Sequence, residues 1–289
     1  MSFPFSQVGI IVKHTITDPI GMIKVLAADL TRAGATVWYG EKTAARLPED
    51  PPGLSRQELR EKADLVIVLG GDGTILSVAR DLVGSGIPIL GINIGELGFL
   101  TETPLEQSAT VTDHLARGRY VIENRMMLRC VARRGGEVLS EHHVLNDVVV
   151  SRRALARILD LDLYMDDGFV SSYRTDGLLL ATPTGSTAYN LAAGGPLIVP
   201  TMAAIVVSPI APHSLTARPL VIADTARLEV RFTGGAEDIY CTLDGQEGVA
   251  LTEEDVVEVS KSPEHTPLIR FPENQFFTIL RAKLRWGER

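Results

Sequence analysis

Short apolar runs recur along the first part of the chain, and segments with helical spacing separate them. The runs at 8–12, 35–39, 65–70 and 87–92 are apolar at nearly every position. Such runs are typical of strands that are buried on both faces of a parallel sheet. The alternation of strand and helix therefore predicts an α/β domain with a doubly wound parallel sheet, whose ligands bind at the carboxyl ends of its strands.

The helices of this half are predicted from periodicity and from their end signals. A helix at 19–33 begins with a proline and is followed by a glycine, and a helix at 74–83 is likewise followed by a glycine. The sequence Thr-Pro-Leu-Glu at 103–106 predicts a capping box that opens a third helix, which ends before Gly118. Residues 41–62 are polar and contain prolines, so we expect a connection there.

From about Arg119 onward, apolar and polar residues alternate singly. The segment 159–165 alternates strictly, which is the pattern of a strand with one buried face. Glycine-containing turns at 134–136 and 166–168 predict hairpins. Further strands are predicted at 144–150, 178–181, 205–208, 227–232 and 256–259. The last segment, 275–286, returns to helical spacing.

These patterns predict two domains and a terminal helix. The 289 residues are more than one typical core organises. We expect an α/β domain over 1–118, a β-rich domain over 119–274 and a C-terminal helix within 275–289.

The run at 65–70 ends in a glycine-rich turn, Gly-Gly-Asp-Gly-Thr, that contains Asp72 and Gly73. A glycine turn between a buried strand and a helix brings backbone N–H groups to a helix N-terminus, where phosphate oxygens bind. A carboxylate beside a phosphate site repels the ligand unless it binds a metal or takes a proton from a hydroxyl. The alternative is that Asp72 is an ordinary turn residue, which is common in Asp-Gly pairs.

Composition narrows the classes of ligand. The chain has 28 Lys and Arg against 36 Asp and Glu, a net charge of −8, which argues against a broad surface for nucleic acid or anionic membranes. No lysine occurs between Lys62 and Lys261, so the lysines of a Walker P-loop and of a protein-kinase nucleotide site are missing from the central region. Two distant cysteines without metal-ligand spacing, and a start unlike a signal peptide, predict a cytoplasmic protein.

Three further segments carry polar residues suited to binding. Asn146 and Asp147 interrupt a predicted strand, and a strand-end bulge is the alternative explanation. The hydroxyl-rich segment 182–190 suits either a helix start or hydrogen bonds to a base or phosphate. Residues 174–177, Arg-Thr-Asp-Gly, place a cation and a carboxylate before a strand, where a surface ion pair or turn is equally expected. The sequence Leu-Asp-Gly-Gln at 243–246 predicts a hairpin turn.

No protein-built metal site is predicted. His142 and His143 are neighbours on a predicted strand and therefore point to opposite faces of it. The aspartates between 160 and 167 fit the solvated face and turn of one hairpin better than a calcium loop.

Taken together, these motifs closely resemble those of the NAD kinase family. The resemblance begins at the Gly-Gly-Asp-Gly-Thr turn and continues through 93–101, Asn-Ile-Gly-Glu-Leu-Gly-Phe-Leu-Thr. It then covers 146–147, 174–177, 182–189 with 194–196, and 214–220 in family order, and so most of the chain. The Gly-Gly-Asp-Gly string alone is also found in diacylglycerol-type lipid kinases and phosphofructokinases, so the combination carries the specificity.

The resemblance implies ATP-dependent phosphorylation of NAD at the 2′-hydroxyl of the adenosine ribose, giving NADP. It implies that Asp72 accepts the proton and that Asn146 and Asp147 hold ribose hydroxyls. Arg157 falls at a binding position whose residue type varies in the family. The other matched NAD-binding positions are Gly73, Arg174, Asp176, Thr187, Ala188, Tyr189, Asn190, Leu191, Ala192 and Gln246.

The resemblance also implies partners and cofactors. Arg174 and Asp176 match nucleotide contacts that reach across subunits in the family, so a homo-oligomer, dimer or tetramer, is expected. The family's site lies between its two domains, and the chain end packs back on the first domain. Mg²⁺ bound mainly through the ATP phosphates would neutralise their charge in place of the missing lysine. The alternatives are a non-catalytic NAD(P)-binding sensor, which would not need Asp72, and a lipid kinase, which would need an apolar groove or a membrane-docking surface.

Overall fold

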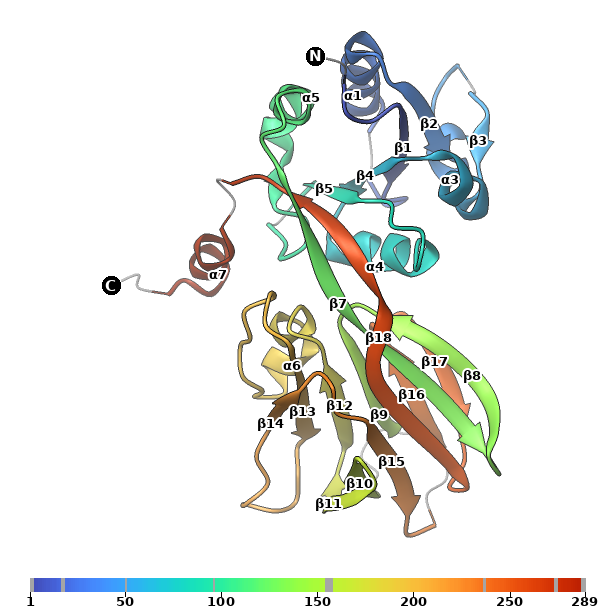
Figure 1. Cartoon of the computed structure of the whole chain (residues 1–289), viewed down its shortest axis with the longest axis vertical. Helices are drawn as coiled ribbons and strands as arrows, with labels where there is room; N and C mark the ends of the chain where they lie inside the picture. The colour runs from blue at the N-terminus through green and yellow to red at the C-terminus, as the bar shows by residue number, and fades with distance from the viewer. Residues whose placement is uncertain are drawn as a thin grey trace. The chain divides into compact units, whose positions relative to one another are not determined.

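The computed structural model describes residues 3–16, 19–49, 51–95, 97–153, 158–235, 238–272 and 275–286, with the backbone alone at 106, 108 and 109. The chain forms two compact units (Figure 1). Unit 1 comprises Met1–Asn124 and Thr266–Arg289, and unit 2 comprises Arg125–His265. Residues 119–124 and 266–274, which the sequence analysis grouped with the β-rich domain, thus belong to unit 1.

Unit 1 is built on a parallel sheet, as predicted. Its strands lie in the order β5-β4-β1-β2-β3, and all four neighbouring pairs are parallel. The chain runs outward from β1 in both directions, which is the doubly wound arrangement. The bounds are β1 Gln7–Val12, β2 Thr36–Gly40, β3 Gly53–Leu54, β4 Leu65–Gly70 and β5 Ile89–Asn93. All six residues of β4 are buried, as its unbroken apolar run predicted.

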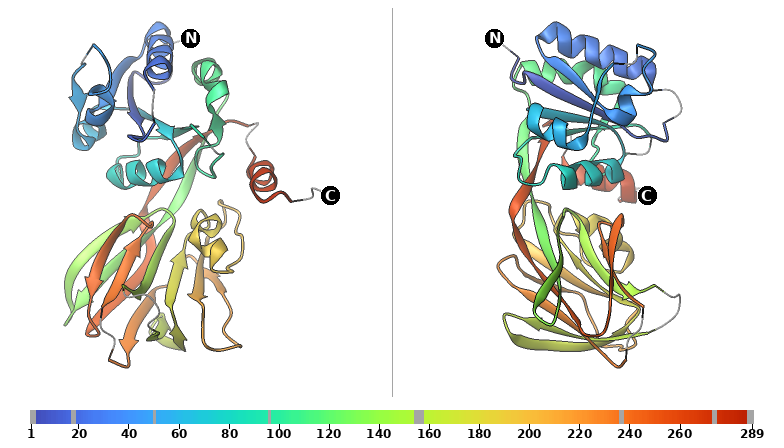
Figure 2. Two further views of the ribbon diagram at one scale, coloured as in Figure 1. Left: turned by 180° about the vertical axis from the view of Figure 1, so that it is seen from behind. Right: turned by 90° about the vertical axis from the view of Figure 1, so that its right-hand side faces the viewer.

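Helices cover both faces of this sheet (Figure 2). Alternate β1 residues such as Val8 and Ile10 join a core that includes Ile23 and Leu30, whereas Gly9 on the opposite face lies against Leu59. The helices are α1 Ile20–Ala33, α2 Glu41–Ala44, α3 Arg56–Lys62, α4 Asp72–Asp81, α5 Ser108–Ala116 and α7 Phe276–Leu284, with a 3₁₀ turn at Leu105–Gln107. No helix within the described ranges is both long and apolar enough to span a membrane.

Two predictions about unit 1 were wrong. Residues 41–62 are not a plain connection, because they contain α2, β3 and α3. Helix α3 begins with a capping box in which the Ser55 hydroxyl accepts from Glu58 N at 3.2 Å while Ser55 N donates to Glu58 Oε2 at 2.8 Å. The helix start predicted at 103–106 is also wrong. Instead, Thr103–Pro104 is a short strand, β6, that pairs with β5, and α5 starts only at Ser108.

Unit 2 is a sandwich of antiparallel sheets. One contains β8 Glu137–Val144, β10 Leu159–Met165, β11 Gly168–Thr175 and β15 Leu228–Thr233, together with most of β7 Val121–Arg134 and of β18 Asp255–Arg270, whose residues 121–124 and 266–270 belong to unit 1. The other has the order β14-β13-β12-β9-β16-β17. Its bounds are β9 Asp147–Arg152, β12 Gly177–Ala181, β13 Ala204–Ile210, β14 Leu220–Ala223, β16 Ile239–Leu243 and β17 Glu247–Leu251. One apolar core takes residues from both sheets, including Leu161 and Val230 from the first and Val150 and Leu180 from the second.

The strands predicted in unit 2 are present, although β14 was not predicted, β18 is much longer than the predicted 256–259, and one predicted strand is divided. The predicted strand 144–150 is two strands, because β8 ends at Val144 and β9 begins at Asp147. The two strands belong to different sheets, since β8 pairs with β7 and β9 pairs with β12 and β16. Asn146 and Asp147 therefore lie where the chain passes from one sheet to the other. We call this segment, residues 145–147, the crossing.

Candidate functional site

Asp72 is the first residue of α4 and lies two residues after the end of β4. Its partly exposed carboxylate accepts four hydrogen bonds from one segment. Oδ2 accepts from Phe99 N at 2.8 Å, and Oδ1 accepts from Leu100 N, Thr101 N and Thr101 Oγ1, each at 3.0 Å. The positive end of the α4 dipole favours negative charge at this position, whether from a carboxylate or from a phosphate. The Gly-Gly-Asp-Gly-Thr turn thus presents a fixed carboxylate at the carboxyl end of a buried parallel strand.

In unit 2, Asn146 and Asp147 are held by the turn between β16 and β17. The Asp244 carboxylate accepts from the backbone N–H groups of Leu145, Asn146 and Asp147 at 3.0, 2.7 and 3.2 Å. Asp244 N in turn donates to Asp147 O at 2.9 Å, and Thr182 N donates to Asn146 O at 2.9 Å. The crossing between the two sheets is therefore a fixed piece of backbone.

The side chains of Asn146 and Asp147 are buried, with exposed fractions of 8% and 4%. Asn146 Oδ1 has no hydrogen-bond partner within the described residues. Burial, and to a smaller extent the nearby Asp244 carboxylate, raise the pKa of Asp147 to about 7. A buried acceptor without a partner costs free energy, which a hydroxyl donor from a ligand would recover.

The hydroxyl-rich segment begins where β12 ends, and it packs against the crossing. A Cβ at Gly185 would lie 2.1 Å from Asn146 O, so only glycine allows this approach. Asn190 is fully buried, its amide donates to Ser186 O and Pro196 O at 3.2 and 3.0 Å, and it accepts from Ser208 Oγ at 2.7 Å. Tyr189 on the same turn is 47% exposed. The Asn190 side chain therefore braces the segment, and Tyr189 can reach a ligand.

The strand register shows which predicted residues lie together. Asp147 pairs with Ala181, and Val148 pairs with Leu243. One end of the six-stranded sheet therefore gathers the crossing, the segment 182–192 and the turn that carries Gln246. The resemblance assigned these residues to one NAD site, whereas the sequence pattern taken without the resemblance did not predict that they lie together.

Arg174 and Asp176 lie at the other end of β12. This strand has five residues, so its two ends are about 13 Å apart. Both side chains are exposed, and neither makes a hydrogen bond or ion pair within the described ranges. Gly73 and Asp72 belong to unit 1, and Arg157 lies outside the described residues.

Sequence reasoning missed three supporting residues. Asp244 was assigned only to a hairpin turn, and Thr101 was part of a motif without a role. Arg125 was not considered; it is 1% exposed, and its Nη1 donates to Thr184 Oγ1 at 3.3 Å. A buried arginine has no local signal beyond its position in an alternating strand.

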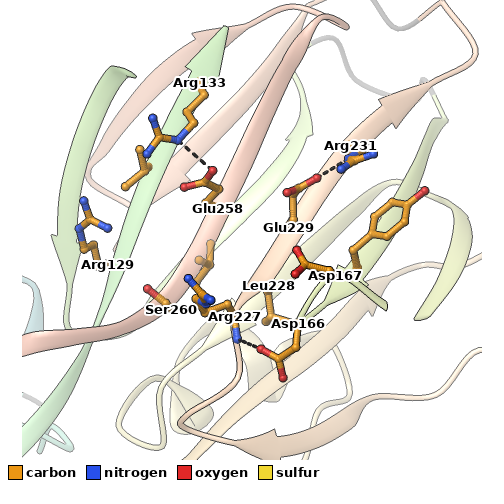
Figure 3. Close-up of a pocket in the computed structure, with 13 residues that line it drawn as sticks. Arg129, Arg133, Asp166, Asp167, Arg227, Leu228, Glu229, Arg231, Glu258 and Ser260 are labelled. Carbon is orange, nitrogen blue, oxygen red and sulfur yellow. Dashed lines mark hydrogen bonds and ion pairs between the residues drawn. The ribbon is translucent and has the colours of Figure 1, made fainter. Parts of the chain in front are cut away.

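Unit 2 also contains an open pocket of about 460 Å³ at a distinct place (Figure 3). Four arginines and four carboxylates line it, and two of each form ion pairs within the lining. Arg133 Nε lies 2.8 Å from Glu258 Oε1, and Arg231 pairs with Glu229. None of the predicted site residues that the structure describes lines the pocket. Because its charges are largely neutralised internally, it is a weaker candidate for nucleotide binding than the sheet end that carries Asn146.

Comparisons with known proteins extend over both halves of the chain. Residues 8–120 match the family model of the ATP-NAD kinase N-terminal domain, and residues 145–271 match that of the C-terminal domain. A NAD kinase of Syntrophotalea carbinolica is 41% identical over 283 residues, which are 98% of this chain and 99% of that protein. A NAD kinase of Acidobacterium capsulatum is 47% identical over 229 residues, covering 79% of this chain and 80% of that protein.

Solved structures share the fold. The crystal structure of a NAD kinase from Archaeoglobus fulgidus in complex with ATP gives a TM-score of 0.76 at 27% identity, over 96% of this chain and 98% of that chain. Yeast NADH kinase complexed with NADH gives a TM-score of 0.88 at 23% identity, over 99% of this chain and 89% of that chain. The predicted combination of an α/β domain and a β-rich domain is confirmed.

Proposed function

The chain belongs to the NAD kinase family of phosphotransferases, and we propose that it transfers the γ-phosphate of ATP to the 2′-hydroxyl of the adenosine ribose of NAD. The observation that carries the proposal is Asp72 at the carboxyl end of β4, in the first turn of α4. Ligands of open α/β sheets bind at this edge. Phosphoryl transfer requires positioning, charge neutralisation and a group that takes the hydroxyl proton.

In the proposed mechanism, Asp72 is the general base. It removes the proton of the 2′-hydroxyl while the ribose oxygen attacks the γ-phosphorus and ADP leaves. A positioned base typically contributes roughly 10²–10⁴-fold to the rate. A non-catalytic sensor gains nothing from a carboxylate beside phosphates, so Asp72 favours the kinase.

Asn146 and Asp147 are the proposed ribose contacts. The buried Asn146 Oδ1 can accept a hydrogen bond from a ribose hydroxyl, and so can the ionised carboxylate of Asp147. Tyr189 is exposed beside the crossing and can stack against the adenine. The other proposed NAD contacts are Gly73, Arg157, Arg174, Asp176, Thr187, Ala188, Asn190, Leu191, Ala192 and Gln246.

We propose that the divalent metal enters as part of the substrate, MgATP. Within the described residues, no three or more His, Cys, Asp or Glu side chains gather as a metal site would require. The ATP phosphates would then supply most ligands of the ion, which neutralises the charge that develops on them.

We further propose a homo-oligomer that works in the cytoplasm, where ATP and NAD are available. Arg174 near the end of β11 and Asp176 just before β12 are exposed and lie beyond the end of β12 that is about 13 Å from the crossing, which supports a role at a neighbouring subunit's nucleotide. Light scattering at assay concentration tests the oligomer. A fully active monomer would exclude it.

The deciding experiment is a coupled assay of NADP formation. The purified protein is supplied with NAD or NADH as acceptor and with MgATP or polyphosphate as donor. We expect steady turnover of NAD with MgATP and no phosphorylation of diacylglycerol. Tight binding of NAD without turnover would instead favour the sensor.

A further inference from the structure

The four hydrogen bonds to Asp72 are distributed unequally between its two oxygens. Oδ1 accepts three of them, two from backbone N–H groups and one from the Thr101 hydroxyl, whereas Oδ2 accepts only that of Phe99 N. A carboxylate offers about four acceptor positions, two on each oxygen. Oδ1 is therefore saturated, and Oδ2 keeps an open position.

The Thr101 hydroxyl is itself fixed in orientation. Thr101 is fully buried, and its Oγ1 accepts from Asn93 Nδ2 at 2.7 Å. Asn93 is the last residue of β5 and is 4% exposed. A hydroxyl has a single proton, and with the Asn93 amide on one side that proton points to Asp72 Oδ1.

Close packing holds the carboxylate from the same side. A Cβ on Gly98 would lie 2.0 Å from Asp72 Oδ1 and 2.3 Å from Thr101 Oγ1. The backbone of the segment also closes on itself, because Gly98 N donates to Thr101 O at 3.3 Å. The carboxylate thus has one orientation in which Oδ1 is enclosed.

We propose that Thr101 is a positioning residue, whose hydroxyl, oriented by Asn93, holds Asp72 Oδ1 so that Oδ2 accepts the proton of the substrate hydroxyl. This inference rests on the proposed function. In the step, the proton passes from the 2′-hydroxyl to Oδ2, and the 2′-oxygen forms a bond to the γ-phosphorus. The bond from that phosphorus to the bridging oxygen breaks, and ADP leaves with the electron pair. Thr101 does not touch the substrate.

The test compares Thr101→Val, Thr101→Ala and Thr101→Ser with the parent enzyme. Both hydroxyl-free variants should lower kcat by roughly tenfold with little change in KM for NAD or ATP, because binding contacts remain and only the alignment of the base is lost. Thr101→Ser keeps the hydroxyl and should restore kcat. The matched control is Thr43→Val, which removes a hydroxyl that is also buried in unit 1 but accepts from Val12 N at 3.0 Å. This control should lower the melting temperature without the selective loss of kcat.

A second readout does not depend on activity. Crystal structures of the parent and of the hydroxyl-free variant that folds better should show the Asp72 carboxylate in one orientation in the parent and in more than one in the variant. Unchanged kcat in both hydroxyl-free variants, a serine variant as impaired as the valine variant, or an unmoved carboxylate would overturn the proposal. A parent enzyme that forms no NADP, or an active Asp72→Asn variant, would instead contradict the proposed function.

Discussion

Replacing Asp147 by asparagine should stabilise the ligand-free protein, and the gain should grow as the pH rises from 5 to 8. Asp147 is 4% exposed, and no described residue donates a hydrogen bond to its carboxylate. Its pKa is raised to about 7 by burial and by Asp244. The folded state therefore holds a proton on Asp147 that the unfolded chain, titrating near pH 4, has already lost.

The size of the effect follows from proton linkage. Because the pKa of Asp147 is raised in the folded state, the contribution of this carboxyl to the free energy of unfolding is fully present below pH 4. This contribution is lost as the pH rises towards 7. With pKa values of about 4 unfolded and about 7 folded, the loss is about 1.5 kcal/mol at pH 5 and about 4 kcal/mol at pH 8. Asparagine has nearly the same shape and no charge, so the Asp147→Asn variant avoids this loss.

The measurement is urea unfolding of both proteins at pH 5, 6, 7 and 8 without nucleotide. The matched control is Asp167→Asn, which makes the same chemical change at an exposed residue of the β10–β11 turn. The control should leave the pH dependence as in the parent. If Asp147→Asn and the parent differ by the same free energy of unfolding at pH 5 and pH 8, the reasoning about Asp147 is wrong.

Three further outcomes are expected. Asp72→Asn should lower kcat at least about a hundredfold, with an unchanged melting temperature and a similar NAD affinity by calorimetry. A lower melting temperature with normal turnover would instead make Asp72 a structural turn residue. Asn146→Ala should raise KM for NAD roughly 5- to 150-fold, equivalent to about 1–3 kcal/mol, and an unchanged KM would remove Asn146 from the ribose contacts. Ser55→Ala should destabilise unit 1 by about 1 kcal/mol through loss of the α3 cap, with kcat unaffected; an unchanged melting temperature would contradict the cap's contribution.

The buried strands could be predicted because each one is a local run of apolar residues. Every residue of β4 is buried, and its run is apolar throughout. Helix α3 was missed since it has seven residues with only Leu59 buried, too few for a periodic pattern. The same four-residue capping signature begins a helix at Ser55 but lies at a strand, β6, at Thr103. The difference is long-range, because pairing with Ile92 places Thr103 in a strand.

The candidate site residues also differ in how far they could be predicted from the local sequence. Asp72 could be singled out because a strand, a glycine turn and a helix surround it in the sequence. Asp244 could not, because the backbone groups that it holds lie 97 to 99 positions away. Thr101 acts on Asp72 across 29 positions, and a hydroxyl by itself gives no sign of such a partner. Asp72 could thus be predicted from the sequence, whereas the residues that hold the candidate site residues in place could not.

Unit 1 is assembled from the two ends of the chain, and this has a consequence for synthesis. Leu268 pairs with Ile89 of β5, and Ile269 and Phe271 fill the same core as Val8 and Ile10. A nascent chain folds progressively from its N-terminus. Unit 2 is contiguous and is complete once residue 265 has emerged, while the half that carries Asp72 still lacks part of its interior. A ribosome that stops early would release a protein with a finished β-sandwich and an unfinished unit 1.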